Sequence, residues 1–338
     1  MAQPDRYWKL LGHREVSAER GRIVCVANQK GGVAKTTTAI NVAAGLALRG
    51  HRVLVVDADP QSNATTGLGF DHRTVTPTTY DLLMGEAVLD DVIRDGAIPN
   101  LAVAPASLDL AGAEIELVGA EGRETKLATS LDGATERFDL TFIDCPPSLG
   151  LLTINACAAA DDLIVPVQCE YYALEGLGQL LETADRVRES INHDLRVSGF
   201  LLTMYDARTK LAGQVADDVR KHFGPRVFNT VIPRSVRLSE APSFGEPALT
   251  LDASARGAVA YRLLAQEVEA LYGLEVHRPP SPIDVVRAEN EQTSTRATPG
   301  PGGRGYGITT QKPAGIDSSW PPRDPYSAAT SRKEEMTR

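Results

Sequence analysis

The chain has 338 residues, of which 42% are hydrophobic, so it can form one large globular domain or two ordinary ones. Its formal net charge of −9 at pH 7 argues against a uniformly basic nucleic-acid binder. No apolar run approaches the ~20 residues that a membrane span requires. Charged side chains also interrupt the first fifteen residues, where a signal peptide would need an apolar core. We therefore expect a cytoplasmic protein.

Composition divides the chain into three parts. Residues 1–20 are polar and are expected to be a flexible extension, whereas residues 21–273 carry the regular apolar runs of a folded domain. Residues 274–338 form a tail, in which the stretch 279–338 contains 9 prolines and 6 glycines with few large aliphatic residues. Such a composition buries too little apolar surface to fold, so we expect this tail to be disordered.

The folded part alternates short apolar runs with helix-like stretches. Buried strands joined by helices are typical of an α/β fold with a mostly parallel, doubly wound sheet covered by helices on both faces. The last helix is expected over 254–272. The expected strands are 23–27, 53–57, 101–104, 140–144, 163–167, 197–204 and 227–232.

The first expected strand leads into a phosphate-binding loop over residues 29–37, which read QKGGVAKTT. A strand, a Gly-Gly turn and a helix over 35–49 present backbone N–H groups to an anion. Lys35 is placed to reach the β- and γ-phosphates, Thr36 to bring its hydroxyl to Mg²⁺, and Thr37 to contact the α-phosphate. The expected nucleotide-binding residues of this loop are Lys30, Gly31, Gly32, Val33, Ala34, Lys35, Thr36 and Thr37.

This loop departs from the usual phosphate-binding pattern, which has glycines six residues and one residue before its lysine. Counted back from Lys35, those positions hold Gln29 and Ala34. The loop instead carries a second lysine, Lys30, at its entrance. Because one lysine suffices to hold a phosphate tail, Lys30 requires a role of its own.

Two further expected strands end in carboxylates. The run 53–57 ends at Asp57 and is followed by Asp59, and the run 140–144 ends at Asp144. An aspartate at the carboxyl end of a parallel strand faces the crevice in which ligands bind. Asp144 suits a Mg²⁺ role through water, Asp59 suits orientation of the attacking water, and Asp57 suits a metal-shell or structural role.

The four cysteines are Cys25, Cys145, Cys157 and Cys169, and none forms a C-x-x-C pair. The spacing typical of metal ligands is therefore absent. Cys25 falls in an apolar strand and Cys157 in an Ala-rich helix, so both are expected to be small buried hydrophobic residues. Disulfides are not expected in a cytoplasmic protein.

Together these motifs resemble those of the ParA/MinD family of deviant Walker-A ATPases, specifically the chromosomal ParA (Soj-like) partition proteins. The resemblance covers about residues 20–272. It rests on five ordered segments: 28–38 (NQKGGVAKTTT), 56–65 (VDADPQSNAT), 143–148 (IDCPPS), 202–209 (LTMYDART) and 231–243 (VIPRSVRLSEAPS).

This resemblance implies that ATP and Mg²⁺ are the cofactors and that the ATP-bound protein is a sandwich homodimer. Lys30 is like the signature lysine, which crosses to the partner subunit's nucleotide and stabilises transition-state charge there. Asp59 matches the aspartate whose loss blocks hydrolysis, so the implied catalytic residues are Lys30, Lys35 and Asp59. Pro233 and Ser235 match the loop that contacts the adenine base.

The resemblance also implies non-specific DNA binding, because Arg208 and Arg237 match arginines implicated in it. Residues 186–262 contain 12 Lys and Arg against 8 Asp and Glu, or +4, and the rest of the chain then carries −13. Without the resemblance, this bias fits ordinary solvated helix faces equally well. DNA binding by such a patch should be electrostatic and fall steeply with salt.

Ala34 is the one departure from the family pattern, since most relatives have glycine there. A positive φ is sterically disfavoured for an L-residue with a side chain. We therefore expect Ala34 to have a negative φ and the loop to be otherwise normal.

Three functions use this fold. The first is a DNA-partitioning ATPase, for chromosome or plasmid segregation, that coats nucleoid DNA until a ParB-type centromere-binding partner stimulates slow hydrolysis. The second is a membrane-cycling positioning ATPase like MinD, but the tail lacks a basic amphipathic targeting helix, so no membrane partner is expected. The third is a metal-cluster carrier, for which the cluster cysteines are missing. We therefore expect the partitioning ATPase.

Overall fold

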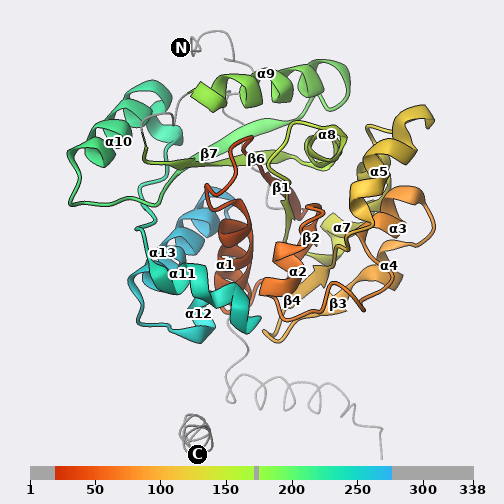
Figure 1. The fold of residues 1–338 in the computed structure, drawn as a ribbon, viewed down its shortest axis with the longest axis horizontal. Coiled ribbons are helices and arrows are strands. Elements are labelled where there is room, and N and C mark those ends of the chain that lie inside the picture. Colours follow the sequence, from red (N-terminus) through yellow and green to blue (C-terminus); the bar gives the residue numbers. More distant parts are fainter. Residues whose placement is uncertain (1–19, 171–174, 276–338) are drawn as a thin grey trace, which may run out of the picture. The chain divides into compact units, whose positions relative to one another are not determined.

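The computed structural model in Figure 1 describes residues 20–170 and 175–275. The expected N-terminal extension and Pro/Gly-rich tail lie outside these ranges, apart from Arg20 and residues 274–275. None of the helices in the described ranges is long and apolar enough to cross a membrane.

A seven-stranded sheet forms the centre of the fold, in the order β3-β4-β2-β5-β1-β6-β7. All neighbouring strands are parallel except the β3–β4 edge pair, which is antiparallel. The expected α/β class and mostly parallel sheet are therefore confirmed. The strands are β1 (Arg22–Val26), β2 (Val53–Asp57), β3 (Arg94–Asp95), β4 (Leu101–Ala104), β5 (Leu140–Asp144), β6 (Asp162–Gln168) and β7 (Arg196–Thr203).

Strand register brings the predicted site together at one edge. Strand β5 lies between β1 and β2, so the loop after β1 emerges beside the end of β5. Asp144 at the end of β5 is paired in register with Asp57 of β2 on one side and with Val26 of β1 on the other. Two aspartates and the phosphate-binding loop thus share the carboxyl edge of three adjacent strands.

Helices cover both faces of this sheet, and in Figure 1 α1 and α9 lie on opposite sides of β6 and β7. The strands alternate accordingly: Ile23 and Cys25 of β1 join one buried cluster, and Val24 and Val26 join the other. The helices are α1 (Lys35–Ala47), α2 (Asn63–Gly67), α3 (Thr79–Met84), α4 (Leu89–Val92), α5 (Leu110–Glu116), α6 (Lys126–Ser130), α7 (Ala134–Arg137), α8 (Leu151–Ala159), α9 (Glu175–Ser190), α10 (Lys210–Phe223), α11 (Val236–Glu240), α12 (Ala248–Leu251) and α13 (Arg256–Leu271).

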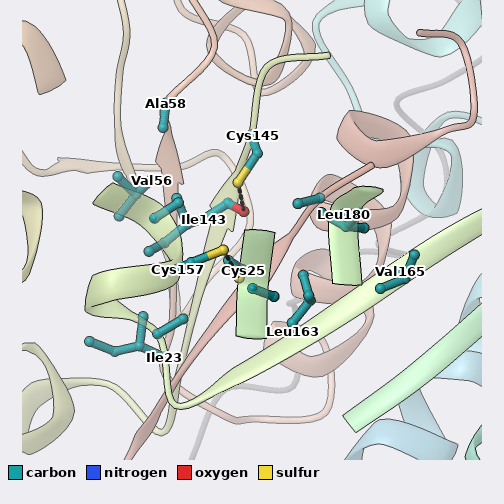
Figure 2. Close-up of a cluster of buried hydrophobic side chains, with 14 of the residues drawn as sticks. Ile23, Cys25, Val56, Ala58, Ile143, Cys145, Cys157, Leu163, Val165 and Leu180 are labelled. Atoms are coloured by element: carbon teal, nitrogen blue, oxygen red, sulfur yellow. Dashed lines mark hydrogen bonds between the residues drawn. The ribbon is translucent and has the colours of Figure 1, made fainter. Parts of the chain in front are cut away.

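All four cysteines are buried and free, in agreement with the role expected for Cys25 and Cys157. Figure 2 shows three of them among aliphatic side chains from β1, β2, β5 and β6. The sulfur atoms of Cys25 and Cys157 are 4.0 Å apart. Burial among apolar groups raises the pKa of the Cys145 thiol, which keeps it protonated and unreactive.

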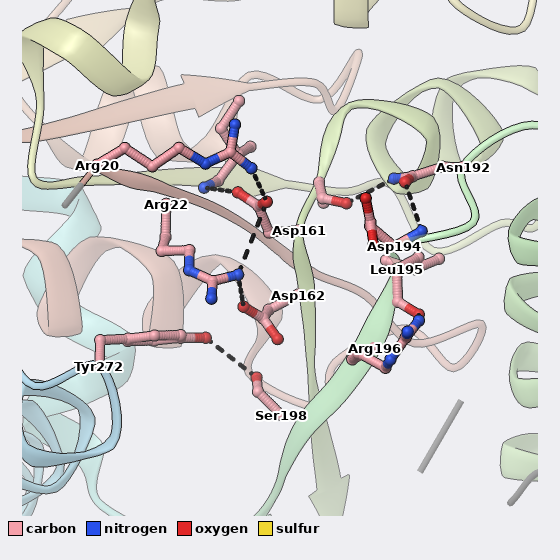
Figure 3. Close-up of polar contacts among 12 residues, drawn as sticks. Arg20, Arg22, Asp161, Asp162, Asn192, Asp194, Leu195, Arg196, Ser198 and Tyr272 are labelled. Carbon is pink, nitrogen blue, oxygen red and sulfur yellow. Dashed lines mark hydrogen bonds and ion pairs between the residues drawn. The ribbon is translucent and has the colours of Figure 1, made fainter. Parts of the chain in front are cut away.

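Ion pairs join the amino ends of β1 and β6, at the end of the sheet opposite the predicted site (Figure 3). Arg22 at the start of β1 is buried, and its Nη1 lies 3.4 Å from Asp162 and 3.7 Å from Asp161. Asp161 also accepts a hydrogen bond from the backbone N–H of Ile23. Because β1 and β6 begin here, these contacts fix the register of the strand that leads to the loop.

Two strand assignments differ from the sequence expectation. Residues 227–232 run beside β7 but form one isolated bridge, between Val227 and Phe200, because the N–H groups of Asn229 and Thr230 donate to Glu267 instead of to a strand. The edge strand β3 was not expected, since its two residues, Arg94 and Asp95, are charged and show no apolar pattern.

We predict that Gly45 is required for the close packing of α1 on α13. A Cβ at Gly45 would lie 2.7 Å from the Cβ of Ala265, so Gly45→Val should lower the unfolding free energy by about 1–3 kcal/mol. Gly213 in α10 is the matched control, because a Cβ there meets nothing within 4 Å. Gly213→Ala should raise stability by ~0.5–1 kcal/mol. Urea titrations of both variants check this, and equal effects would contradict it.

Candidate nucleotide-binding site

Side chains distant in the sequence hold the phosphate-binding loop in place. Asn28 donates from its Nδ2 to the carbonyl of Pro166 in β6 at 2.7 Å and accepts from the N–H of Lys30 at 3.0 Å. At the other end of the loop, the hydroxyl of Thr203 in β7 donates to the carbonyl of Val33 at 3.0 Å. The loop is thus tied to β6 and β7, and neither Asn28 nor Thr203 was singled out from the sequence as a loop-positioning residue.

The conformation of Ala34 contradicts the sequence expectation. Ala34 has φ 70° and ψ 35°, in the left-handed region, where it caps the N-terminus of α1. The expected negative φ is therefore wrong. The carbonyl of Ala34 accepts the N–H of Thr38 at 2.9 Å, so the residue is held by the first turn of the helix. The loop keeps the backbone that glycine would adopt and accepts the strain of a methyl group.

The two loop lysines occupy different environments. Lys35 is buried, and its ammonium donates to the carbonyl of Lys30 at 3.3 Å. Burial lowers the pKa of Lys35, opposed by the nearby Asp144 and Asp59 carboxylates. Lys30 is half-exposed and reaches the surface carboxylate of Glu170, with its Nζ 3.5 Å from Oε2. Only Lys35 lies among the carboxylates of its own site.

Asp57 and Asp59 are both buried and are positioned by backbone N–H groups. Asp57 accepts from the N–H of Asp59 and from both the N–H and the hydroxyl of Thr65. Asp59 accepts from the N–H of Gln61 at 2.9 Å. Burial raises the pKa of Asp57 to about 6, although its hydrogen bonds with Thr65 oppose the shift. These contacts give Asp57 a structural role in shaping the turn that presents Asp59.

Asp144 is fully buried, and neither of its oxygens has a hydrogen-bond partner among the described residues. Burial raises its pKa well above the ordinary range, and repulsion from Asp57 adds to the rise. The neighbouring Thr36 hydroxyl and Lys35 oppose it. An unpartnered carboxylate beside other carboxylates is costly unless a cation compensates it.

This donor set fits Mg²⁺. A hydroxyl from Thr36 and the free oxygens of Asp144 are hard oxygen donors of the kind that Mg²⁺ prefers, either directly or through water. Within the described residues, no three acidic, histidine or cysteine side chains form a complete metal cage. A Mg²⁺ site that takes one or two protein oxygens, waters and substrate phosphates needs no such cage.

A cavity of about 400 Å³ opens beside the loop. Its walls include Thr36 and Thr37 from the loop together with Pro233 and Ser235 from the segment after β7. The structure therefore brings the expected phosphate and adenine contacts to one cavity, while Lys30, Lys35 and the three aspartates lie outside its lining. Further lining residues, not singled out from the sequence, include Asn41, Asn63, Gln168, Glu170, Met204 and Glu246.

The two expected DNA-contact arginines lie outside this cavity and are exposed. Arg208 is 87% exposed at its side chain and pairs with Asp206 at 2.6 Å. Arg237, in α11, pairs with Glu240 at 2.9 Å and lies 3.7 Å from Asp252. Each arginine is therefore accessible to a phosphate but is partly neutralised by its own chain.

Comparison with known proteins identifies the family. A family model described as an AAA domain matches residues 21–197. The sporulation initiation inhibitor protein Soj of Bacillus subtilis is 54% identical over 250 residues, covering 74% of this chain and 99% of Soj. The chain belongs to the ParA/Soj family of chromosome-partitioning ATPases. The chromosome partitioning protein ParA of Caulobacter vibrioides is 52% identical over 255 residues, covering 75% and 96% of the two chains.

Solved structures of similar proteins hold the expected cofactors. A cobyrinic acid a,c-diamide synthase from Mycobacterium smegmatis with bound ADP and magnesium is 38% identical, with TM-score 0.67, covering 75% of this ParA/Soj member and 96% of that chain. MinD of Pyrococcus horikoshii complexed with Mg-ADP is 27% identical, with TM-score 0.63, covering 76% and 100%. The prediction of a nucleotide with Mg²⁺ as cofactors is confirmed for the family.

We predict that Ala34→Gly stabilises the protein, because it relieves the strain of a left-handed alanine. The strain costs about 1–2 kcal/mol, and glycine adds ~0.4–1 kcal/mol of unfolded-state entropy, so the net gain is between about 0 and 1.6 kcal/mol. The matched control is Gly32→Ala, at φ 72° with open space around the position, which should lose a similar amount. Denaturant unfolding without nucleotide measures both, and a destabilised Ala34→Gly would contradict the assignment.

We predict that Asp144→Asn stabilises the protein in EDTA while abolishing Mg²⁺-dependent hydrolysis. The folded pKa of Asp144 is raised, so the unfolded chain loses this proton at lower pH than the folded chain does, and stability falls as pH rises. The gain of Asp144→Asn should therefore grow from pH 5 to pH 8 and exceed about 1 kcal/mol at pH 8.

Asp57→Asn provides the control for that experiment. Asp57 is equally buried, but three hydrogen bonds from Asp59 and Thr65 converge on its oxygens. Replacing one oxygen by an amide removes acceptors, so this variant should be destabilised at pH 5, where the charge contributes least. Urea titrations at both pH values separate the cases, and a destabilised Asp144→Asn at pH 8 would refute the unpartnered-carboxylate interpretation.

Proposed function

We propose that this partitioning ATPase forms an ATP-sandwich dimer, binds DNA non-specifically in that state, and leaves DNA when a ParB-type partner stimulates hydrolysis. The place of action would be the nucleoid in the cytoplasm, with chromosomal or plasmid DNA as cargo. The single observation that carries the proposal is the separation of the two loop lysines. Lys35 lies among the carboxylates of its own site, whereas Lys30 points to the surface and pairs with Glu170.

In this arrangement, the site of one subunit lacks a second cation for the charge that develops on the γ-phosphate. Among the described residues, Lys35 is the cation whose charge acts on Asp144 and Asp59, and its ammonium donates to the loop backbone. A γ-phosphate gains charge on its outer oxygens during transfer, and a cation from outside the site stabilises that charge. Lys30 of a second subunit supplies such a cation when two sites face each other. The weak surface pair with Glu170 costs little to break.

Within one subunit, each site residue has a distinct role. The backbone of residues 31–35 and the Lys35 ammonium hold the phosphates, Thr37 contacts the α-phosphate, and Thr36 and Asp144 hold Mg²⁺. Bound Mg²⁺ neutralises the β- and γ-phosphate oxygens. Asp59 orients the attacking water, and Pro233 and Ser235 line the base end of the cavity.

DNA binding follows from the exposed arginines. Arg208 and Arg237 each pair with a carboxylate of their own chain, so a DNA phosphate has to displace Asp206 or Glu240. One subunit therefore binds DNA weakly. A dimer doubles the number of phosphate contacts, and because each contact releases counterions, the salt dependence of binding becomes steeper.

A MinD-like membrane-cycling ATPase is the alternative. The two functions differ in whether the ATP-bound protein binds DNA or a membrane. The residues described here present paired, exposed arginines on α11 and after β7, which suit phosphate contacts along DNA. Retention on anionic liposomes instead of DNA in the presence of ATP would favour the alternative.

We predict that Lys30→Ala still binds ATP but neither dimerises nor hydrolyses it, because it removes only the cation supplied across the dimer. Glu170→Ala is the matched control, since it breaks the same surface pair and leaves Lys30 intact, so it should dimerise. Arg237→Glu should dimerise normally and lose DNA binding by about tenfold or more. Sedimentation with ATP, ATPase assays and DNA retention at two salt concentrations measure these properties. A Lys30→Ala variant with normal dimers and turnover would overturn the proposal.

A further inference from the structure

Helix α5 and the short 3₁₀ turn that follows it, Leu117–Gly119, are apolar on two faces. The inward face, at spacing 3 and 4, is buried in the core and consists of Leu110, Ala113 and Leu117. A second stripe, at spacing 3, 4 and 3, faces solvent and consists of Leu108, Ala111, Ile115 and Val118. We call these four residues the α5 stripe.

The α5 stripe is strongly exposed. Leu108 is 60% exposed, Ile115 77% and Val118 62%. Single exposed apolar residues are ordinary, but three large ones at helical spacing form a continuous apolar face. A helix that is apolar on both faces is typical of a helix buried on both sides. The outward face of α5 therefore lacks a partner within the described part of the chain.

Charge around the stripe is mostly negative. Residues 107–122 contain four carboxylates, Asp109, Glu114, Glu116 and Glu121, and no lysine or arginine. The one basic side chain at its end is Arg123, which donates to the carbonyl of Val118 and pairs with Glu124 among the described residues. Within the described residues, none of the four forms an ion pair with a basic side chain: Glu116 accepts from the Tyr80 hydroxyl and Glu114 from the N–H of Leu152. An apolar stripe with an acidic rim is complementary to a segment that carries both apolar and basic side chains.

The same charge disfavours a symmetric contact between copies of this chain through the stripe. A two-fold axis would place the four carboxylates of one copy against the four of the other. Like charges brought together across an interface destabilise it. A separate partner with lysines or arginines removes this cost and gains from the same carboxylates.

Helix α5, which carries the stripe, also contacts the segment between Asp144 and α8. Glu114 of α5 packs so closely on the start of α8 that a Cβ at Gly150 would lie 2.3 Å from its Oε1. Residues 145–149 connect Asp144 to Gly150. One of them, Pro147, packs against the phosphate-binding loop, since a Cβ added at Gly31 would lie 3.8 Å from its Cβ. A partner seated on α5 therefore acts on the segment that joins Asp144 to α8 and touches the phosphate-binding loop.

We propose that the α5 stripe is the docking surface for a basic, amphipathic segment of the partner protein that stimulates hydrolysis. This inference rests on the proposed function, because it locates the step at which the ParB-type partner acts. Apolar side chains of the segment cover Ile115 and Val118, and its basic side chains face the carboxylates of the rim. The docked segment then changes the conformation of residues 144–150, which carry Asp144.

The test compares Ile115→Ser/Val118→Ser with Leu263→Ser, which changes an exposed leucine on α13, away from the stripe. A third variant, Glu121→Lys, reverses one charge of the rim. The probes are the purified ParB-type protein of the same genome and two labelled synthetic peptides. One peptide is an amphipathic helix of Lys and Leu, and the other has Glu in place of every Lys.

We expect the Lys/Leu peptide to bind the wild type at least about tenfold more tightly than the Glu/Leu peptide. The stripe variant and Glu121→Lys should lose most of that difference, and Leu263→Ser should keep it. ParB-type stimulation should fall about tenfold in the stripe variant, while its basal ATPase activity and DNA retention stay unchanged. Equal peptide binding or equal stimulation of the stripe variant and wild type would overturn the inference.

Two further outcomes separate this inference from the proposed function. If the ParB-type protein stimulates the wild type and the stripe variant alike, the proposed cycle stands and the docking surface is wrong. If the ParB-type protein fails to stimulate the wild type, the partner step of the proposed function fails and the peptide measurements alone decide the surface. Loss of ATP-dependent dimers in the stripe variant would show a contact between copies and overturn the inference.

Discussion

The pairing of β2 with β5 is the constraint on which the rest of the site depends, since it places Asp57 directly beside Asp144. Two carboxylates at neighbouring positions of a buried sheet repel each other, and burial raises the pKa of both. The fold compensates Asp57 with hydrogen bonds from Thr65 and leaves Asp144 without any. That asymmetry suits Asp57 to a structural role and leaves the oxygens of Asp144 free to face a cation.

Much of this fold could be predicted because every strand except β3 is short and largely apolar, and β1, β2 and β5 lead into residues with recognisable chemistry. The bounds of β2, β4 and β5 match the expectation to the residue. Residues 227–232 look equally strand-like, but Glu267 on a distant helix takes two of their N–H groups. No local pattern reveals that competition, because it depends on α13 packing beside β7.

Sequence motifs name the candidate site residues, but they do not reveal the contacts with distant backbone groups that shape the site. Asn28 and Thr203 hold the loop through carbonyl groups 138 and 170 residues away in the sequence. The backbone of Ala34 was also not predictable from its residue type. Steric preference alone favours a negative φ for alanine. The helix start at Lys35 and the hydrogen bond from Thr38 hold a left-handed residue at this position, so the geometry of the loop-to-helix junction overrides the steric preference of alanine.

The uneven charge of the chain acquires a meaning once it is placed on the fold. The arginines on α11 and after β7 each pair with a carboxylate of the same chain. Among the described residues, by contrast, Asp109, Glu114 and Glu116 on and beside α5 form hydrogen bonds with neutral groups and no ion pair. A surface that is already partly neutralised binds a polyanion weakly and releases it readily. An unneutralised acidic surface with an apolar centre suits a basic protein segment. The net charge of −9 is therefore unevenly distributed: residues 107–122 carry −4 and residues 186–262 carry +4, so the proposed docking surface and the proposed DNA contacts use regions of opposite charge.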